Sequence, residues 1–281
     1  MAALCLLLAC SAQAELKLFL KGTDPREISE LQSLLVKDVG EELALTAVDS
    51  LEKADLAIII GADVLRSLPE KRPPVLLLDP TPSSVPLQKS DGAVYWSPSL
   101  AAQLSLTRYL LPATNRIGML VGNRSEDQSW LRVFKQYAAA QSIDVRIVEA
   151  DPARLARQIA ELATHCDVLL AQPDVTIYNR DTIRLILLAA YRQNRVLIGP
   201  GPAFVRAGSL ASLYAPPARI AEAVAQSLRY FSRNERLPAP YRLKQFSVSL
   251  NAQVARSLGL TVPAVNELER LLRFEELPTW P

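Results

Sequence analysis

The imidazole and thiol groups that many catalytic proteins use are scarce in this chain, which has one His and three Cys among its 281 residues. His165 and Cys166 are neighbours in the sequence. Neighbouring side chains point to opposite faces of a strand and lie about 100° apart on a helix, so this pair is poorly placed to act as base and nucleophile. We interpret the two residues as a helix-end histidine and a core cysteine. Their scarcity argues against most catalytic chemistries.

Sequence motifs of the common catalytic folds are also missing. The chain has no Gly-x-Ser-x-Gly turn, no phosphate loop that ends in Gly-Lys-Ser/Thr, and no Gly-x-Gly-x-x-Gly after its first expected strand. Gly199-Pro200-Gly201 lacks the third glycine. The charged residues Glu126-Asp127, Arg154 and Arg157 are interpreted as solvated helix charges. We therefore expect a binding protein with no enzymatic activity, cofactor or metal, and a hydrolase that depends on Asp174 is the enzymatic alternative.

The elements that must position any ligand-binding side chains alternate between short apolar segments and segments of helical periodicity. Residues 57–60 and 75–78 are apolar on both faces, which is typical of strands buried in a parallel sheet. Asp24 followed by Pro25 predicts the start of a helix. The expected strands are 16–20, 43–48, 56–60, 75–78, 93–96, 116–121, 143–148, 168–171, 196–198, 209–214 and 245–250. The expected helices are 25–36, 100–111, 128–141, 152–164, 181–193, 217–231, 252–258 and 267–274.

Two similar cycles of this alternation predict two α/β lobes, each a doubly wound parallel sheet covered by helices. We expect lobe 1 to comprise residues 15–95 with part of 215–245, and lobe 2 to comprise residues 97–213 with part of 246–263. Residues 264–281 are expected to form a C-terminal tail that begins with a short amphipathic helix.

The first fourteen residues predict an export signal. They carry no charged side chain, and Ala12-Gln13-Ala14 fits the small-x-small site that precedes a signal peptidase cut. We therefore expect residues 1–14 to be a signal peptide and the mature protein to be periplasmic. Residues 7–10 also resemble a bacterial lipobox, and acylation of Cys10 would tether the mature protein to a membrane.

The overall composition restricts the partners. Hydrophobic residues make up 49% and charged residues 21%, which is typical of a globular protein with an ample core. A formal net charge of +2 provides no global field for nucleic acid, so no nucleic-acid partner is expected. No apolar run reaches the roughly 18–20 residues that a membrane-spanning helix needs.

Small, hydroxyl and amide residues follow the expected strands. In open α/β sheets, ligands bind outside the carboxyl ends of the strands, where helix-start N–H groups suit a carboxylate or another small anion. Any single loop of this kind is better interpreted as caps and turns, whereas six of them around one cleft favour binding. The six loops are 21–24, 61–63, 79–84, 122–129, 172–176 and 199–202. The candidate ligand-binding residues of the first lobe are Gly22, Thr23, Gly61, Ala62 and Asp79.

Three segments of the second half resemble one known family. Residues 172–180, QPDVTIYNR, resemble its LPDPxVxSNR segment, and residues 204–212, FVRAGSLAS, resemble its FVxAGGLMSY segment. Residues 246–263 are similar to its closing segment, FELVINLKTAKALGLTIP. The family is the ABC transporter substrate-binding proteins of the type I periplasmic-binding fold, which includes tryptophan- and tyrosine-type binders. The resemblance covers about residues 100–263.

This resemblance implies two lobes joined by a hinge, with a small solute held between them. The family's ligand loops map onto Asn123, Ser125, Gln128, Asp174 and Thr176 of this chain. The implied function is that of a periplasmic solute-binding protein of an ABC transporter, which binds a small polar solute such as an amino acid or a carboxylate and then engages a permease. The alternative is a non-transport periplasmic interaction protein on the same fold, with a membrane sensor as its partner.

Overall fold

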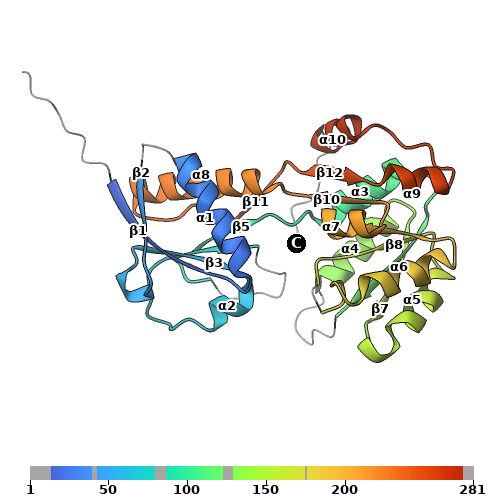
Figure 1. Cartoon of the computed structure of the whole chain (residues 1–281), viewed down its shortest axis with the longest axis horizontal. Coiled ribbons are helices and arrows are strands. Elements are labelled where there is room, and N and C mark those ends of the chain that lie inside the picture. Colours follow the sequence, from blue (N-terminus) through green and yellow to red (C-terminus); the bar gives the residue numbers. More distant parts are fainter. Residues whose placement is uncertain (1–13, 40–42, 80–86, 123–128, 175, 275–281) are drawn as a thin grey trace, which may run out of the picture. The chain divides into compact units, whose positions relative to one another are not determined.

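The computed structural model describes residues 14–39, 43–79, 87–122, 129–174 and 176–274, and it divides the chain into two compact units (Figure 1). Unit 1 comprises Met1–Thr81, Val85–Tyr95 and Pro217–Tyr241, and unit 2 comprises Pro82–Ser84, Trp96–Pro216 and Arg242–Pro281. The expected signal peptide lies outside the described residues, apart from Ala14. Each unit is described by itself below.

Unit 1 contains a six-stranded sheet in the order β11-β5-β4-β3-β1-β2. Its strands are β1 (Ala14–Lys21), β2 (Leu43–Ala47), β3 (Leu56–Ile60), β4 (Val75–Leu78), β5 (Gly92–Tyr95) and β11 (Tyr241–Arg242), whose last residue begins unit 2. The pairs formed among β1 to β5 are parallel. The helices are α1 (Pro25–Val39), α2 (Ala62–Arg66) and α8 (Pro217–Asn234), with a 3-10 turn η2 (Leu51–Lys53). The helices α1 and α8 pack against each other.

Unit 2 contains a second six-stranded sheet in the order β12-β10-β9-β8-β6-β7. Its strands are β6 (Arg116–Val121), β7 (Asp144–Glu149), β8 (Val168–Leu170), β9 (Val196–Gly199), β10 (Ala211–Tyr214) and β12 (Ser247–Leu250). The pairs formed among β6 to β10 are parallel, whereas β12 runs antiparallel to β10 at the edge. The helices are α3 (Leu100–Leu110), α4 (Ser129–Ala139), α5 (Leu155–Ala163), α6 (Ile183–Tyr191), α7 (Pro202–Ala207), α9 (Ala252–Ser257) and α10 (Val265–Phe274), with a 3-10 turn η3 (Pro152–Arg154).

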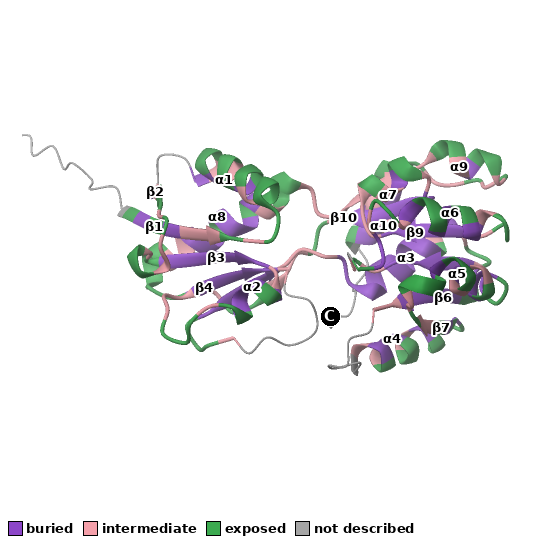
Figure 2. Cartoon of the chain, turned by 60° about the horizontal axis from the view of Figure 1, so that its bottom comes forward, coloured by how far each residue is buried: buried purple, intermediate pink, exposed green. Residues whose placement is uncertain are grey.

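The sheet of unit 2 is covered by apolar side chains on both faces. Val168 and Leu170 of β8 belong to one core cluster, with residues of α3, α4 and α10, whereas Leu169 between them belongs to the other, with residues of α5 and α6. This alternation follows from the two-residue period of a strand. The buried strands of both units are purple in Figure 2. The expected fold class, two α/β lobes with parallel sheets, is confirmed.

The short helices α2 and α7 were not expected, because the loops 61–63 and 199–202 were predicted there. Both helices begin directly after a glycine near the end of a strand, where the sequence indicates a turn. The expected helix 152–164 is also divided. Asp151 accepts a hydrogen bond from the Ala153 amide, and a 3-10 turn precedes α5. By contrast, α1 begins at Pro25 as predicted, and the Asp24 carboxylate accepts the Arg26 amide at 2.8 Å.

A buried ion pair fixes the segments that lead into β4 and β5. The Arg72 guanidinium donates two hydrogen bonds to the Asp91 carboxylate, at 2.8 and 2.7 Å, and the two side chains are only 5% and 0% exposed. The backbone amides of Val75 and Gln88 donate to the same carboxylate, at 2.9 and 2.8 Å. Four donors therefore compensate for the desolvation of this charge.

We expect Asp91→Asn to destabilise unit 1 by about 3–5 kcal/mol, because it leaves the buried Arg72 charge without its counter-charge. Urea unfolding followed by circular dichroism would measure the loss. The matched control is Asp63→Asn, which breaks an ion pair with Arg66 in which the Asp63 side chain is 88% exposed. This control should change the stability little. Equal unfolding midpoints for the two variants would contradict a structural role for the buried pair.

Candidate functional site

In open α/β sheets, ligands bind at the carboxyl edge, where the parallel strands end, and at the point where the strand order reverses. In unit 2 the order reverses beside β6, since β7 lies on one side of it and β8 on the other. Gly122 follows β6, and Asp174 lies four residues after the end of β8. A Cβ atom placed on Gly122 would lie 2.6 Å from Oδ2 of Asp174. The two loops therefore meet at the switch point, and only glycine leaves room there for the carboxylate.

The Asp174 carboxylate is held in a fixed orientation by its own loop. Its Oδ1 atom accepts hydrogen bonds from the amide and the hydroxyl of Thr176, at 3.0 and 2.6 Å. Its backbone carbonyl accepts the amides of Ile177 and Tyr178, at 3.1 and 2.7 Å. No donor among the described residues binds Oδ2. One carboxylate oxygen is thus used by the fold, while the other retains its acceptor capacity beside Gly122.

A pair of aromatic residues stabilises the loop that contains Asp174. Tyr178 is buried, and its ring meets the ring of Phe204 edge to face, with centroids 6.3 Å apart and an interplanar angle of 78°. Burial raises the pKa of the Tyr178 phenol, a backbone hydrogen bond at Leu120 opposes the rise, and the Asp174 carboxylate adds to it. The phenol therefore stays neutral, and Tyr178 is a support of the loop that sequence reasoning did not single out.

The cationic side chains of this edge lie on the β7 side. A hollow of about 480 Å³ is lined by Val121, which ends β6, Glu149, which ends β7, and residues of α4. Two of its lining residues, Arg132 and Lys135, are exposed cations. The carboxyl edge of unit 2 thus presents the Asp174 carboxylate on one side of β6, and two cations together with the Glu149 carboxylate on the other. These cations were also missed, because an amphipathic helix does not reveal which of its charges lie near a strand end.

In unit 1 the strand order reverses beside β1, between β2 and β3. Gly22 follows β1 and packs closely on β3, because a Cβ atom there would lie 3.1 Å from Cβ of Ile60. The amide of Gly61 donates to the carbonyl of Leu78, so it is used by the sheet, and Ala62 is buried in α2. Thr23 is exposed beside Gly22. The structure therefore places Gly22, Thr23 and Gly61 at one edge but leaves Ala62 without an accessible side chain.

Several carboxylates lie at the same edge of unit 1. Asp79, which follows β4, has a positive φ of 46°, and its amide donates to Val94. Burial, followed by the charges of Asp24, Asp79 and Glu30, raises the pKa of Glu27 in the first turn of α1. Like charges thus contribute to this shift after burial, so several negative groups lie close together at this edge. Glu27 was not among the expected site residues, although its place in the first turn after β1 is a usable signal.

The expected residues Asn123, Ser125 and Gln128 lie outside the described residues. Among the residues that the structure does describe, no group of three or more His, Cys, Asp and Glu side chains is arranged to hold a metal ion. No described helix is long and apolar enough to cross a membrane.

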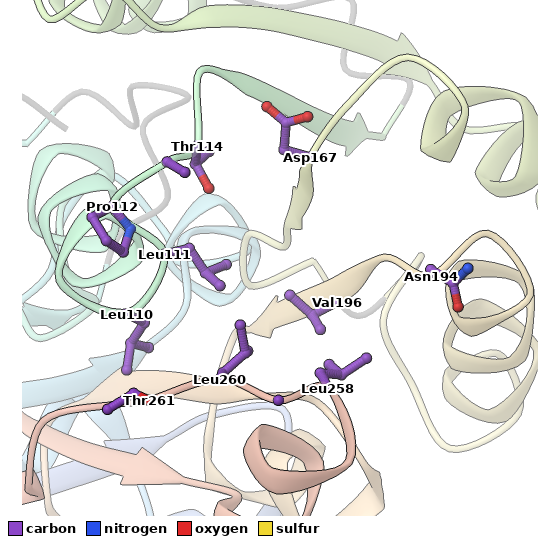
Figure 3. A pocket seen from close by; sticks show the side chains of 12 residues that line it. Leu110, Leu111, Pro112, Thr114, Asp167, Asn194, Val196, Leu258, Leu260 and Thr261 are labelled. Atoms are coloured by element: carbon purple, nitrogen blue, oxygen red, sulfur yellow. The ribbon is translucent and has the colours of Figure 1, made fainter.

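A larger hollow lies at the opposite, amino edge of the unit 2 sheet (Figure 3). It has a volume of about 720 Å³ and is bordered by Thr114 and Asp167, which precede β6 and β8, and by Val196, the first residue of β9. Burial alone would raise the pKa of Asp167, but hydrogen bonds from the Arg116 side chain and from the backbone amides of Asn115 and Arg116 lower it below its usual value. The Asp167 carboxylate is thus bound within the fold, and this hollow lies at the edge opposite the carboxyl ends of the strands.

His165 and Cys166 differ in environment. The His165 ring is exposed, and its Nδ1 lies 2.7 Å from the Thr164 hydroxyl and 2.9 Å from the Glu161 carbonyl. Cys166 is fully buried among side chains of α5 and its neighbours. The interpretation as a helix-end histidine and a core cysteine is confirmed. Arg154 and Arg157 are exposed and paired with Asp151 and Glu161, as expected for solvated helix charges.

Comparison with known proteins identifies the fold. No protein-family model matches the sequence, and no curated protein matches it. Solved structures do match. A conserved domain protein from Vibrio cholerae has 18% identity and a TM-score of 0.67, with 92% of this chain and 98% of that chain covered. The ABC domain from Streptococcus pneumoniae in complex with L-Trp has 17% identity and a TM-score of 0.65, with 92% and 98% covered.

A ligand-free, open substrate-binding protein with adhesive properties from Clostridium difficile has 16% identity and a TM-score of 0.69, with 89% of this chain and 96% of that chain covered. Regulators of the LacI family also match, with lower TM-scores; one from Corynebacterium glutamicum reaches 0.55. At these identities the likeness shows the fold alone. The chain therefore has a periplasmic-binding-protein-like fold, with two lobes of mainly parallel sheet and flanking helices.

We expect Gly122→Ala to destabilise the fold by about 1–3 kcal/mol, because the new methyl group meets the fixed Asp174 carboxylate. The matched control is Gly201→Ala at the same edge, where nothing lies within 4 Å of the new Cβ atom; it should be close to neutral. The cost of Gly122→Ala should largely disappear in an Asp174→Ala background. Additive losses in this double-mutant cycle, measured by urea unfolding, would contradict the contact.

We expect Cys166 to be unreactive in the folded protein. Burial raises the pKa of its thiol to about 11, so the thiolate fraction at pH 8 is on the order of a hundredfold below that of an ordinary thiol. Pulse alkylation with mass spectrometry would show little label at Cys166 until the chain unfolds. The same shift means that stability is unaffected below the pKa of a free thiol and decreases as the pH rises toward 11. Rapid labelling under native conditions would refute this.

Proposed function

We propose that this chain is a solute-binding protein whose ligand site uses the carboxyl edge of the unit 2 sheet. The observation that carries the proposal is the arrangement of Asp174, whose Oδ1 is fixed by Thr176 while Oδ2 lies beside Gly122 at the strand-order switch. The fold class supports it, because one matching structure is a substrate-binding protein and another is an ABC domain in complex with L-Trp.

The charges at the carboxyl edge of unit 2 favour a solute with an ammonium group. Asp174 is a negative group at this edge, and its Oδ2 atom accepts no hydrogen bond from the described residues. A ligand ammonium would donate a charged hydrogen bond to this oxygen. Arg132 and Lys135, which line the hollow beside β7, suit a carboxylate. An amino acid carries both groups, so we propose an amino acid, in preference to a simple carboxylate, as the solute.

We further propose that the protein is exported and delivers its solute to the permease of an ABC transporter. The segment of residues 1–14 supports export, either as a signal peptide cleaved after Ala14 or as a lipoprotein leader acylated at Cys10. Mass spectrometry of the mature N-terminus would distinguish the two. Cross-linking in cells of the ligand-loaded protein would capture a permease if the protein serves transport. A membrane sensor captured in its place would favour the non-transport alternative.

We expect an L-amino acid to raise the melting temperature. A ligand at about 100 times its Kd adds about 2.7 kcal/mol to the free energy of unfolding. A thermal-shift panel should contain the twenty L-amino acids, the corresponding carboxylates without the amino group, and the corresponding amines without the carboxylate. Each of the last two sets lacks one recognised group, so it should shift the melting temperature less than its parent amino acid.

The panel also needs variants that separate the site from general charge effects. Asp174→Asn should weaken the binding of the best amino acid at least about tenfold, because a charged hydrogen bond is lost. Asp144→Asn removes the same charge at the start of β7, at the amino edge of the same sheet, and should leave binding unchanged. If no compound in the panel stabilises the protein, or if both variants bind equally well, the proposed site is wrong.

A further inference from the structure

The outer side of α6 carries an apolar patch that no described residue covers. Large exposed hydrophobic side chains are few among the described residues, and two of them, Leu185 and Leu188, lie one turn apart on this helix, 41% and 53% exposed. Exposed residues of α6 are visible in Figure 2. The helix turns Ile183, Ile186 and Leu187 into the core. The two leucines are therefore additional to what the core requires.

A charge lies at each end of this patch. Asp181 and Arg192 are exposed, and neither side chain forms an ion pair or hydrogen bond with another described residue. Helical hydrogen bonding includes both positions, because Ile183 donates to Asn179 and Arg192 donates to Leu188. With spacings of four, three and four residues, Asp181, Leu185, Leu188 and Arg192 lie within about 60° on one side of the helix. We call these four residues the α6 stripe.

The α6 stripe is complementary to itself in the antiparallel direction. Its centre lies midway between Leu185 and Leu188. A second copy related by a two-fold axis at this point would place Leu185 opposite Leu188, and Asp181 opposite Arg192, twice over. Such a self-complementary patch is the requirement for a two-fold dimer interface. The exposed Arg184 would fall opposite Ala189, so the same axis places no second cation against it.

The elements on either side of α6 are compatible with this contact. The helices α5 and α7 both pack against α6, and they would extend an interface that the stripe alone makes too small for a strong dimer. The Arg157 and Glu161 charges of α5 are paired within their own helix, at 2.7 Å. Helix α5 therefore places no unpaired charge of one sign beside the stripe, whereas α7 contributes the exposed Arg206.

We propose that the α6 stripe is the interface of a homodimer, in which a second copy of this chain packs its α6 antiparallel against the first. The stripe lies within unit 2 and uses none of the residues assigned to ligand binding, so the dimer stands independently of the proposed function. The partner is a second copy because the stripe carries both charges of each ion pair, so that Asp181 of one copy lies opposite Arg192 of the other. A different protein would have no reason to require this symmetry.

Sedimentation equilibrium of the full chain, from about 1 to 500 micromolar, tests the proposal. The wild type should dimerise with a micromolar Kd. Leu188→Asp should abolish the dimer, and each single charge reversal, Asp181→Arg or Arg192→Asp, should weaken it at least about tenfold, because two attractive pairs become repulsive by symmetry. The double reversal should restore the dimer. Val36→Asp on α1, where the native side chain is 63% exposed, is the matched control and should have no effect.

Mixing the two single charge-reversal variants is the most specific test of the antiparallel interface. A chain with Asp181→Arg and a chain with Arg192→Asp should form a heterodimer about as tight as the wild type, because both cross-pairs become attractive. A parallel arrangement, or an interface elsewhere, does not predict this rescue. The rescue also shows that both variants are folded. A wild type that is monomeric over the whole range, a dimer that is insensitive to these substitutions, or a failure of the mixture to associate would each overturn the proposal.

Discussion

The burial of a parallel sheet on both faces is the constraint on which this molecule depends. Because helices cover both faces, successive strand residues must alternate between two cores, as Val168, Leu169 and Leu170 do. The crossover connections return β1 to β5 in one direction within the first sheet and β6 to β10 in one direction within the second. The loops that follow these strands therefore gather at one edge of each sheet, whatever their sequences are. The polar residues there are free to serve binding since the core does not require them.

The sequence predicts the elements that have this constraint in their own residues. The runs 57–60 and 75–78 are apolar on both faces, and both are fully buried strands. Helices of three turns or more were recognised because their apolar periodicity is long enough to be read. The helices α2 and α7 were missed because each begins directly after a glycine near the end of a strand, where the sequence indicates a loop. Helix α9 is as short as α7 but was predicted, so the length of an element alone does not decide what a sequence reveals.

The contacts that define the site were less predictable, because they join residues far apart in the chain. Asp174 was recognised as a candidate from its position after a strand and from the family resemblance. Its contact with Gly122 was not, because that contact forms only where β6 and β8 are adjacent in the sheet. Likewise, the Arg72–Asp91 pair joins two segments 19 residues apart, and neither residue belongs to a recognisable motif. The pKa of Glu27 is raised first by burial and then by the charges of Asp24, Asp79 and Glu30, of which Asp79 is distant in the chain. Spacing along the chain contains none of this information.

The two aspartates show how the same side chain is used in opposite ways. Asp91 is fully enclosed, and four donors from Arg72, Val75 and Gln88 use both of its oxygens. Such a carboxylate has no remaining acceptor capacity for a ligand, and its interactions serve only to stabilise the fold. Asp174 has one oxygen held by Thr176 and the other beside a glycine that leaves it space. A charged group that is oriented by the fold but not exhausted by it is what a binding site requires, because orientation lowers the entropic cost of binding while the remaining lone pairs supply the attraction. The unused acceptor capacity of Asp174, rather than its charge alone, is therefore the reason to propose a ligand at this edge.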